Sequence, residues 1–330
     1  MSRPARARHR ARSVTGYGSP RSRWVPALAA IAVLVVVAGG FAVASHTPRV
    51  TGPPAADKLV TTPDHYLGVA EANEIASYRP VSEFAAAIGR QPNLVLYYSA
   101  WEDPFYVQLA NAARAHGAAP FVQINPGREP MSAIAAGEED RYLRWYAGQV
   151  RRYGHPVIIG FAPEMNAKWN PWGWHHTKPS VWIAAWRHLV TVFRQAGADN
   201  VTWLWTINAD VHGVTGPIQD WWPGANYVTW VGIDGYYYYA SSTFETVFGA
   251  TINQVRALTG KPVLISETGI GQVAGQAGKI ADLFEGAEAA RVVGFVWFDQ
   301  DQDAGVYHQD WRLEGHRAAL QAFRQALGSY

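Results

Sequence analysis

Two glutamates follow short apolar runs and carry the strongest chemical signal in this chain. Glu164 comes after the run at 157–162, and Glu267 comes after the run at 263–266. Apolar runs rich in β-branched residues predict buried strands. Two carboxyl groups about 5 Å apart can work together, because one attacks a carbon atom while the other transfers a proton. The sequence therefore predicts an acid/base pair, provided that the fold brings the two strand ends together.

The loop after Glu164 is dense in tryptophan, with Trp169, Trp172 and Trp174 within six residues. Flat aromatic faces suit the stacking of sugar rings, so this loop favours chemistry on a carbohydrate. Core packing is the competing explanation for many of the tryptophans. A single glutamate at a strand end is usually a solvated surface group. Two such glutamates, one of them beside this loop, favour the functional interpretation.

Alternating apolar and helical segments predict an α/β fold. The strands are expected at 66–70, 94–99, 120–125, 157–162, 201–208, 228–235, 263–266 and 292–298. Helices are expected at about 82–90, 104–116, 138–153, 181–195, 244–258, 276–286 and 315–327, with Ser180 as the cap of the fourth. Eight strands, each followed by a connection or a helix, predict a (β/α)8 TIM barrel. A doubly wound open sheet is the rival, but the first strand lacks a glycine-rich phosphate loop.

In a (β/α)8 barrel the active site lies at the C-terminal ends of the strands. Glu164 would end the fourth strand and Glu267 the seventh, so both would face one opening. We expect Glu164 to be the general acid/base and Glu267 the nucleophile. An ionised Glu267 nearby would raise the proton affinity of Glu164. Asn208, at the end of the fifth strand, is a candidate ligand for sugar hydroxyls or a cap for its own turn.

The N-terminal region predicts an export or membrane segment. Residues 1–23 form a basic cytoplasmic tail, and residues 24–45 carry no charge. As a helix, residues 24–45 would extend roughly 33 Å at about 1.5 Å per residue, enough to cross a bilayer. A signal peptide cleaved near Ala44 is the alternative. Both interpretations place a linker at 46–62 and a catalytic domain at 63–330 outside the cytoplasm, anchored to the membrane or secreted.

Composition excludes several other functions. Eight arginines precede Asp57 with no acidic residue among them, and removing them from the net charge of +2 leaves about −6 for the remainder. Nucleic-acid binding therefore has no electrostatic support. The chain has no cysteine, which excludes thiolate chemistry. His175 and His176 lack a carboxylate at zinc-motif spacing. We expect no metal, no cofactor and a monomer.

Two motifs resemble glycoside hydrolase family 26, the family of β-mannanases and related β-glucanases and β-xylanases. The segment Pro-Glu-Met-Asn-Ala-Lys-Trp-Asn-Pro-Trp-Gly at 163–173 is similar to its acid/base motif, and Ile-Ser-Glu-Thr-Gly at 265–269 is similar to its nucleophile segment. Supporting segments lie at 133–137, 221–224 and 232–236. The family usually has His immediately before the acid/base glutamate and Arg four residues before it. This chain has Pro163 and Gly160 at those places.

The resemblance implies hydrolysis of a β-linked polysaccharide, such as β-1,4-mannan or a related β-glycan, with retention of configuration. It also implies that Tyr236 hydrogen-bonds the nucleophile, that Trp297 forms the floor of the sugar site, and that Trp169 stacks near the cleaved bond. The expected substrate-binding set is Asn166, Trp169, Trp174, Asn208, Tyr236 and Trp297. The alternatives are a non-catalytic carbohydrate-binding barrel associated with envelope or exopolysaccharide handling, and a structural partner in polysaccharide export.

Overall fold

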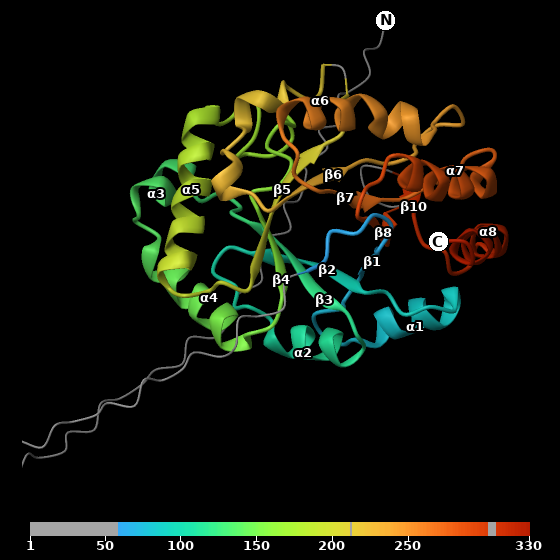
Figure 1. Ribbon diagram of the computed structural model, residues 1–330, viewed down its shortest axis with the longest axis horizontal. Coiled ribbons are helices and arrows are strands. Elements are labelled where there is room, and N and C mark those ends of the chain that lie inside the picture. The colour runs from blue at the N-terminus through green and yellow to red at the C-terminus, as the bar shows by residue number, and fades with distance from the viewer. Residues whose placement is uncertain (1–58, 212, 303–307) are drawn as a thin grey trace, which may run out of the picture. The chain divides into compact units, whose positions relative to one another are not determined.

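A computed structural model describes residues 59–211, 213–302 and 308–330. Eight parallel strands close into a barrel in chain order, because β8 pairs with β1 (Figure 1). They are β1 (Tyr66–Glu71), β2 (Leu94–Ala100), β3 (Ala119–Asn125), β4 (Val157–Phe161), β5 (Val201–Asn208), β6 (Trp230–Asp234), β7 (Val263–Thr268) and β8 (Gly294–Asp299). The predicted (β/α)8 barrel is confirmed, with every predicted strand present.

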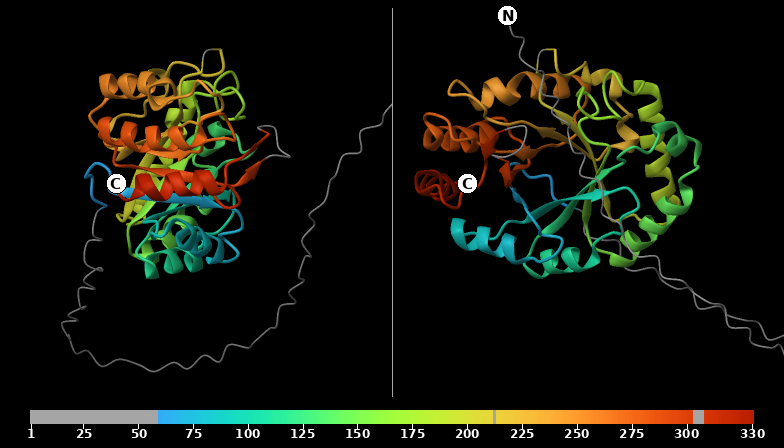
Figure 2. Two further views of the ribbon diagram at one scale, coloured as in Figure 1. Left: turned by 90° about the vertical axis from the view of Figure 1, so that its right-hand side faces the viewer. Right: turned by 180° about the vertical axis from the view of Figure 1, so that it is seen from behind.

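The helices form an outer ring around the barrel, as the right-hand view in Figure 2 shows. They are α1 (Arg79–Ile88), α2 (Val107–Ala115), α3 (Met131–Ala136), α4 (Asp140–Tyr153), α5 (Pro179–Gln195), α6 (Ala250–Leu258), α7 (Gln276–Ala289) and α8 (Arg317–Leu327). Shorter elements are η1 (Ile218–Trp221), η2 (Ala225–Tyr227), η3 (Glu245–Gly249), β9 (Asp301–Gln302) and β10 (Gln309–Asp310). The short helix α3 was not among the predicted elements.

Helix α5 covers the β4 and β5 side of the barrel. Its buried face contains Trp182, Trp186, Leu189 and Phe193, which recur at the predicted helical spacing. The predicted cap at Ser180 is wrong, because the helix already begins at Pro179. Proline suits the first helical position, since its ring fixes φ and its missing N–H has no intrahelical partner there.

Alternation along the strands separates an inner core from an outer one. Val296 and Phe298 of β8 belong to the inner cluster that fills the barrel. Trp297 between them belongs to the outer cluster, and its ring lies 5.3 Å from that of Phe323 on α8. The predicted position of Trp297 as the floor of a sugar site is therefore corrected. One step along a strand moves a side chain to the opposite face.

The segments predicted at 1–23 and 24–45, and all but the end of the linker at 46–62, lie outside the described residues. Within the described part of the chain, no helix combines the length and the apolar character needed to cross a membrane.

Two buried carboxyl groups meet where β1 and β8 close the barrel. Glu71 and Asp299 are paired in register across the two strands and are 8% and 2% exposed. Burial, followed by the charge of Asp299, raises the pKa of Glu71 to about 10. Burial and a hydrogen bond with Glu314 raise the pKa of Asp299 to about 8. These groups are therefore held protonated at neutral pH.

We expect Asp299→Asn to reduce the loss of thermal stability at alkaline pH. Groups whose pKa is raised on folding bind protons that the unfolded chain has released, so stability falls as pH rises from about 4 toward their folded values. Asn retains an oxygen to accept hydrogen bonds from the Leu313 N–H and the Trp297 indole. Melting curves from pH 5 to pH 9 measure this effect, with the exposed Asp220→Asn as the control. An equal decrease in melting temperature from pH 5 to pH 9 in Asp299→Asn, Asp220→Asn and the wild type would contradict this expectation.

Candidate active site

The backbone at the end of β4 adopts a left-handed conformation that residues other than glycine rarely adopt. Ala162 and Glu164 have φ angles of 45° and 54°, which cost roughly 1–2 kcal/mol each for residues with a Cβ atom. Two indoles hold this turn: Trp172 Nε1 donates to the carbonyl of Pro163 at 2.7 Å, and Trp182 Nε1 donates to that of Ala162 at 3.3 Å. These two tryptophans therefore support the site from behind.

The Glu164 carboxylate accepts a hydrogen bond on each oxygen. Asn208 Nδ2 donates to Oε1 at 2.5 Å, and Trp169 Nε1 donates to Oε2 at 2.9 Å. Burial raises the pKa of Glu164, whereas these donors lower it. Trp169 is 43% exposed, so its ring is accessible beside Glu164. The structure thus places Asn208 and Trp169 at Glu164, as members of one site.

Asn166 is fully buried and has a different role from the predicted one. Its Nδ2 donates to the carbonyl of Asn208 at 2.8 Å, and its Oδ1 accepts from the N–H of Asn208 at 2.9 Å. With its amide engaged in this way and no exposed surface, Asn166 is not placed to bind substrate. It joins the end of β4 to the end of β5, which positions the Asn208 side chain that holds Glu164.

Trp174 also supports the loop. Its backbone N–H donates to the carbonyls of Met165 and Ala167. Its half-buried indole lies against Gly216, where an added Cβ would come within 2.8 Å of the ring. Close packing of this kind fixes the indole in one orientation. The predicted contact of Trp174 with sugar stays a prediction.

A register shift in β7 turns Glu267 toward the barrel interior. Ile233 pairs with Ile265, but the next residue, Asp234, pairs with Glu267. A β-bulge of this kind re-aims a side chain. Ser266 Oγ donates to Asp234 Oδ1 at 2.5 Å inside the barrel, so two successive residues of β7 face the same side. Simple alternation would place Glu267 outside.

Two phenols hold the Glu267 carboxylate. Tyr98 of β2 donates to Oε1 at 2.5 Å, and Tyr236, after β6, donates to Oε2 at 2.8 Å. The bond from Tyr236 is the one that the resemblance implied. Burial, and then the charge of Glu164, raise the pKa of Glu267 to about 7, while the two phenols act in the opposite direction. The carboxyl groups of Glu164 and Glu267 therefore share one electrostatic environment at the barrel mouth.

A third carboxyl group lies below this pair. Asp234 is fully buried, and its Oδ2 has no hydrogen-bond partner among the described residues. Burial, followed by the charges of Glu267 and Glu164, raises the pKa of Asp234 well above its usual range. A protonated Asp234 adds no further negative charge beneath the two glutamates.

Trp311 is a fully buried residue that packs behind the tyrosines of the site. Its ring lies 4.8 Å from that of Tyr236 and 5.3 Å from that of Tyr238. It packs on Gly269, where a Cβ atom would be 2.9 Å from the indole. Trp311 follows β10 in a segment without helical or strand periodicity, which is why the sequence pattern did not identify it. Tyr98 was missed because it ends an apolar run that predicts only a strand.

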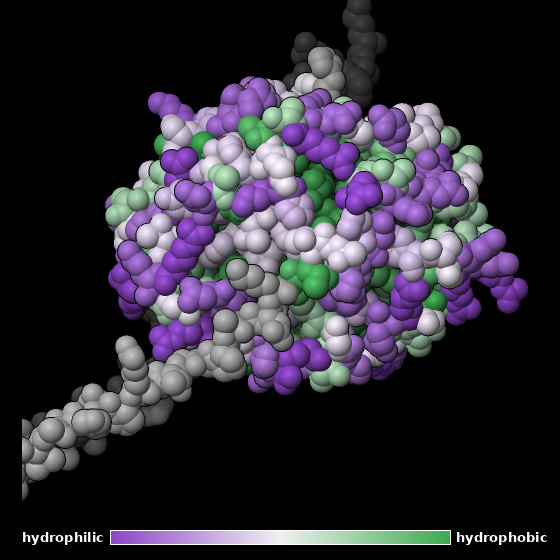
Figure 3. All heavy atoms as spheres, viewed as in Figure 1, coloured by the Kyte–Doolittle hydropathy of each residue, from purple (hydrophilic) through white to green (hydrophobic). Residues whose placement is uncertain are grey.

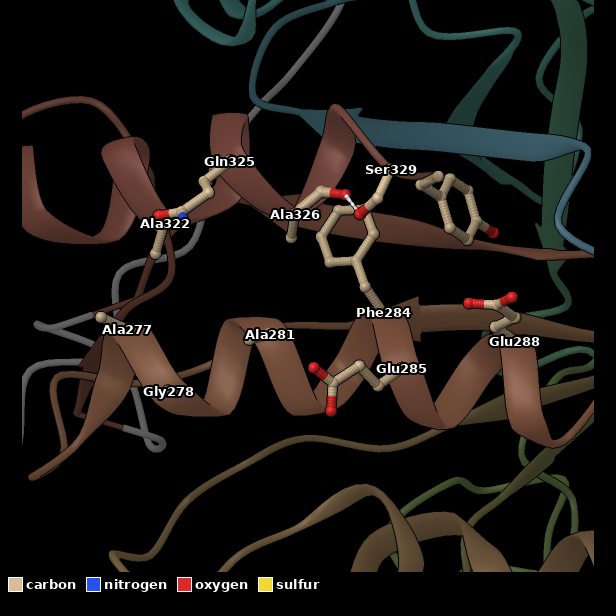
Figure 4. Close-up of a pocket in the computed structure, with 11 residues that line it drawn as sticks. Ala277, Gly278, Ala281, Phe284, Glu285, Glu288, Ala322, Gln325, Ala326 and Ser329 are labelled. Atoms are coloured by element: carbon tan, nitrogen blue, oxygen red, sulfur yellow. Dashed lines mark hydrogen bonds between the residues drawn. The ribbon is translucent and has the colours of Figure 1, made fainter.

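The surface offers other hollows, but they are away from these carboxyl groups. Hydrophilic residues dominate the face in Figure 3, and hydrophobic residues show mainly in its recesses. A groove between α7 and α8, drawn in Figure 4, is lined largely by small side chains such as Ala277, Ala281 and Ala326. It contains neither glutamate of the pair. The candidate active site is therefore the barrel mouth, where the carboxyl groups of Glu164 and Glu267 could serve proton transfer and nucleophilic attack.

Comparison with known proteins finds a matching family and several similar sequences. The sequence profile of glycosyl hydrolase family 26 matches residues 143–323. Endoglucanase H of Acetivibrio thermocellus is 27% identical over 265 residues, which are 76% of this chain and 29% of that protein. A β-1,3-xylanase of a Vibrio species is 26% identical over 128 residues, 38% of this chain and 26% of the xylanase. The chain thus spans less than a third of the length of these relatives.

Solved structures share the barrel. A Cellulomonas fimi endo-β-1,4-mannanase double mutant has a TM-score of 0.60 at 15% identity, covering 80% of this chain and 70% of the other. A family 26 β-mannanase from Bacteroides ovatus has a TM-score of 0.59 at 14% identity, covering 80% and 88%. At such identities the likeness supports the fold.

Proposed function

Because the chain belongs to glycosyl hydrolase family 26 and is a glycosidase, we propose that it cleaves β-linked polysaccharides with retention of configuration. The observation that carries this proposal is the pair of carboxyl groups at one barrel mouth, Glu164 and Glu267, each held by two hydrogen-bond donors. A non-catalytic sugar-binding barrel would need aromatic rings but no such pair.

In the first step, a carboxylate oxygen of Glu267 attacks the anomeric carbon. The bond from that carbon to the leaving oxygen breaks, and Glu164 transfers its proton to this oxygen. The phenols of Tyr98 and Tyr236 keep Glu267 oriented and ionised for the attack. A protonated carboxyl group keeps acceptor capacity, so Trp169 and Asn208 can stay hydrogen-bonded to Glu164 before its proton is transferred.

In the second step, Glu164 is ionised and removes a proton from water. The water oxygen attacks the anomeric carbon, and the ester bond to Glu267 breaks. The product then retains its original configuration, and both glutamates return to their starting states. Esterification removes the charge of Glu267, which lowers the proton affinity of Glu164 and suits its change from acid to base.

The substrate class that we propose is a β-1,4-mannan or a related β-glycan. The relatives and solved structures are named as an endoglucanase, β-1,3-xylanases and β-mannanases. Trp169 beside Glu164, which is 43% exposed, and the partly buried Tyr236 beside Glu267 supply aromatic faces for sugar rings. A screen against mannan, mixed-linkage glucan and β-1,3-xylan distinguishes these substrates.

We also propose an extracytoplasmic location. The uncharged segment 24–45 with its basic N-terminal flank supports membrane anchoring with the catalytic domain outside, or secretion. Polymeric β-glycans are encountered on that side of the membrane. Fractionation of cells that produce the tagged full-length chain, with external protease treatment, tests this proposal; protection of the barrel from protease in intact cells would oppose it.

We expect Glu267→Ala to abolish the release of reducing sugar, because no group remains to form the glycosyl intermediate. Glu164→Ala should lower turnover of polysaccharide by about 10²–10⁴-fold, since proton transfer to the leaving oxygen is lost. With an aryl β-glycoside whose leaving group needs no proton, Glu164→Ala should regain its first step. Hydrolysis rates on both substrate types are the measurement.

A matched control for this pair is Glu245→Ala, which removes an exposed glutamate on η3. It should hydrolyse polysaccharide as the wild type does. Wild-type turnover by Glu267→Ala would refute the assigned roles, and glycan binding without any hydrolysis by the wild type would favour the carbohydrate-binding barrel.

Replacing Trp169 by Phe should move the alkaline limb of the kcat/KM profile to higher pH. The change keeps an aromatic face but removes the indole N–H that favours ionised Glu164. Without this donor the pKa of Glu164 rises, so the acid stays protonated to higher pH. Trp145→Phe, on the exposed face of α4, is the control. An alkaline limb that stays in place, or that moves to lower pH, would contradict the role given to the indole.

A further inference from the structure

The nucleophile lacks a cationic partner in this site. Among the residues that the structure describes, no Lys or Arg forms an ion pair or a hydrogen bond with Glu267. On β4, the residue before Glu164 that faces the barrel interior is Gly160. Gln123 fills the space beside it, and its Oε1 would lie 1.9 Å from a Cβ atom added to Gly160. Neutral groups therefore border the two glutamates on this side.

Tyr98 approaches Glu267 from three strands away. It lies two residues before the end of β2, whereas Tyr236 follows β6, the neighbour of β7. The two phenols reach different oxygens of the same carboxylate, at 2.5 Å and 2.8 Å. Donors on both oxygens from different sides of the barrel prevent the carboxylate from rotating. A hydrogen bond from a neutral donor to a charged acceptor is among the stronger ones in proteins.

Tyr98 keeps its hydroxyl proton and so remains able to donate to Glu267. Burial, and then the charge of Glu267, raise its pKa well above the usual range for a phenol. The hydroxyl proton therefore stays on the phenol and points to Oε1. The residue is half-buried at the rim of the mouth, while its neighbour Tyr97 is fully buried on the opposite face of the strand.

Resting on the assignment of Glu267 as nucleophile, we propose that Tyr98 is a positioning residue that holds the nucleophile ionised in place of a cation. Its hydroxyl stabilises the negative carboxylate and fixes the plane in which that carboxylate attacks. Tyr236 alone would leave Oε1 without this donor. Among the residues that the structure describes, the titratable groups that face Glu267 are Tyr98 of β2, Glu164 after β4, Asp234 at the end of β6 and Tyr236 just after it.

The other acidic groups oppose ionisation of Glu267, so the phenols act against them. The charge of Glu164 raises the pKa of Glu267, and the Tyr98 and Tyr236 hydrogen bonds lower it. Removing the Tyr98 hydroxyl should therefore favour protonated Glu267, which cannot attack. The pKa of Glu267 would therefore rise, and Glu267 would become ionised only at higher pH.

The test is the carboxyl titration of Glu267 in Tyr98→Phe. Protein labelled with ¹³C at the glutamate carboxyl carbon is titrated by NMR, and the Glu267 signal is assigned by its loss in Glu267→Gln. We expect the midpoint to rise by about one pH unit in Tyr98→Phe, the amount that the loss of one hydrogen bond to a charged group predicts. Tyr97→Phe, which removes the same atom from the adjacent residue on the outer face, should leave the midpoint unchanged.

Activity provides an independent second measurement. On a hydrolysed β-glycan, the acidic limb of kcat/KM should move to higher pH in Tyr98→Phe and stay in place in Tyr97→Phe. If the wild type hydrolyses no glycan but the NMR midpoint rises in Tyr98→Phe alone, the proposed function fails and the role of Tyr98 in holding the carboxylate ionised stands. An unchanged or lower midpoint, in an active enzyme or an inactive one, overturns the role of Tyr98.

A variant that retains the hydroxyl protects the test against misfolding of Tyr98→Phe. Site-specific replacement of Tyr98 by 3-fluorotyrosine keeps the ring and makes the phenol a stronger donor. The Glu267 midpoint should then fall below that of the wild type, opposite to the effect of Phe. A midpoint that does not fall would count against the proposal even if Tyr98→Phe gave no folded protein.

Discussion

The site depends on the placement of two mutually repelling carboxyl groups at one barrel mouth, where no Lys or Arg of the described residues is hydrogen-bonded to either. Burial and like charge both favour protonation, so each group must be supported by donors that favour its ionised form. Asn208 and Trp169 do this for Glu164, and Tyr98 and Tyr236 do it for Glu267. Burial and the charges of both glutamates also raise the pKa of Asp234 beneath them, which favours its neutral form.

Two departures from regular strand geometry make this placement possible. At the end of β4, left-handed φ angles at Ala162 and Glu164 turn the chain, and the indoles behind it hold the strained turn. In β7, the register shift brings Glu267 to the interior beside Ser266. Strain and bulges often occur at functional sites, where surrounding packing holds them. Here the regular barrel supplies the scaffold, and the two irregular strand ends aim the carboxyl groups.

Much of the fold followed from patterns that short-range chemistry controls. The eight apolar runs marked all eight strands, and helical spacing marked the core face of α5. The two glutamates and the Tyr236 contact were also predictable, because motif order placed them at known strand ends. Side-chain direction was harder to predict. Trp297 was assigned to the wrong face of β8, and Asn166 was assigned to substrate although it binds the backbone of Asn208.

The missed residues share a physical cause. Tyr98 contacts Glu267, which is 169 residues away in the sequence, and Trp311 contacts Tyr236, which is 75 residues away. No local sequence pattern indicates contacts over such separations. The β7 bulge likewise leaves no mark in an apolar run that reads as an ordinary strand. Tertiary geometry therefore decides which aromatic residues line the mouth and which pack behind it.

The most direct measurement is the configuration of the sugar at the moment of its release. Proton NMR of an oligosaccharide digest, recorded before the product mutarotates, distinguishes the two anomers. A carboxylate pair close enough for attack and proton transfer at one anomeric carbon predicts that the β anomer appears first. Initial release of the α anomer would contradict this, because a single displacement by water requires carboxyl groups set farther apart.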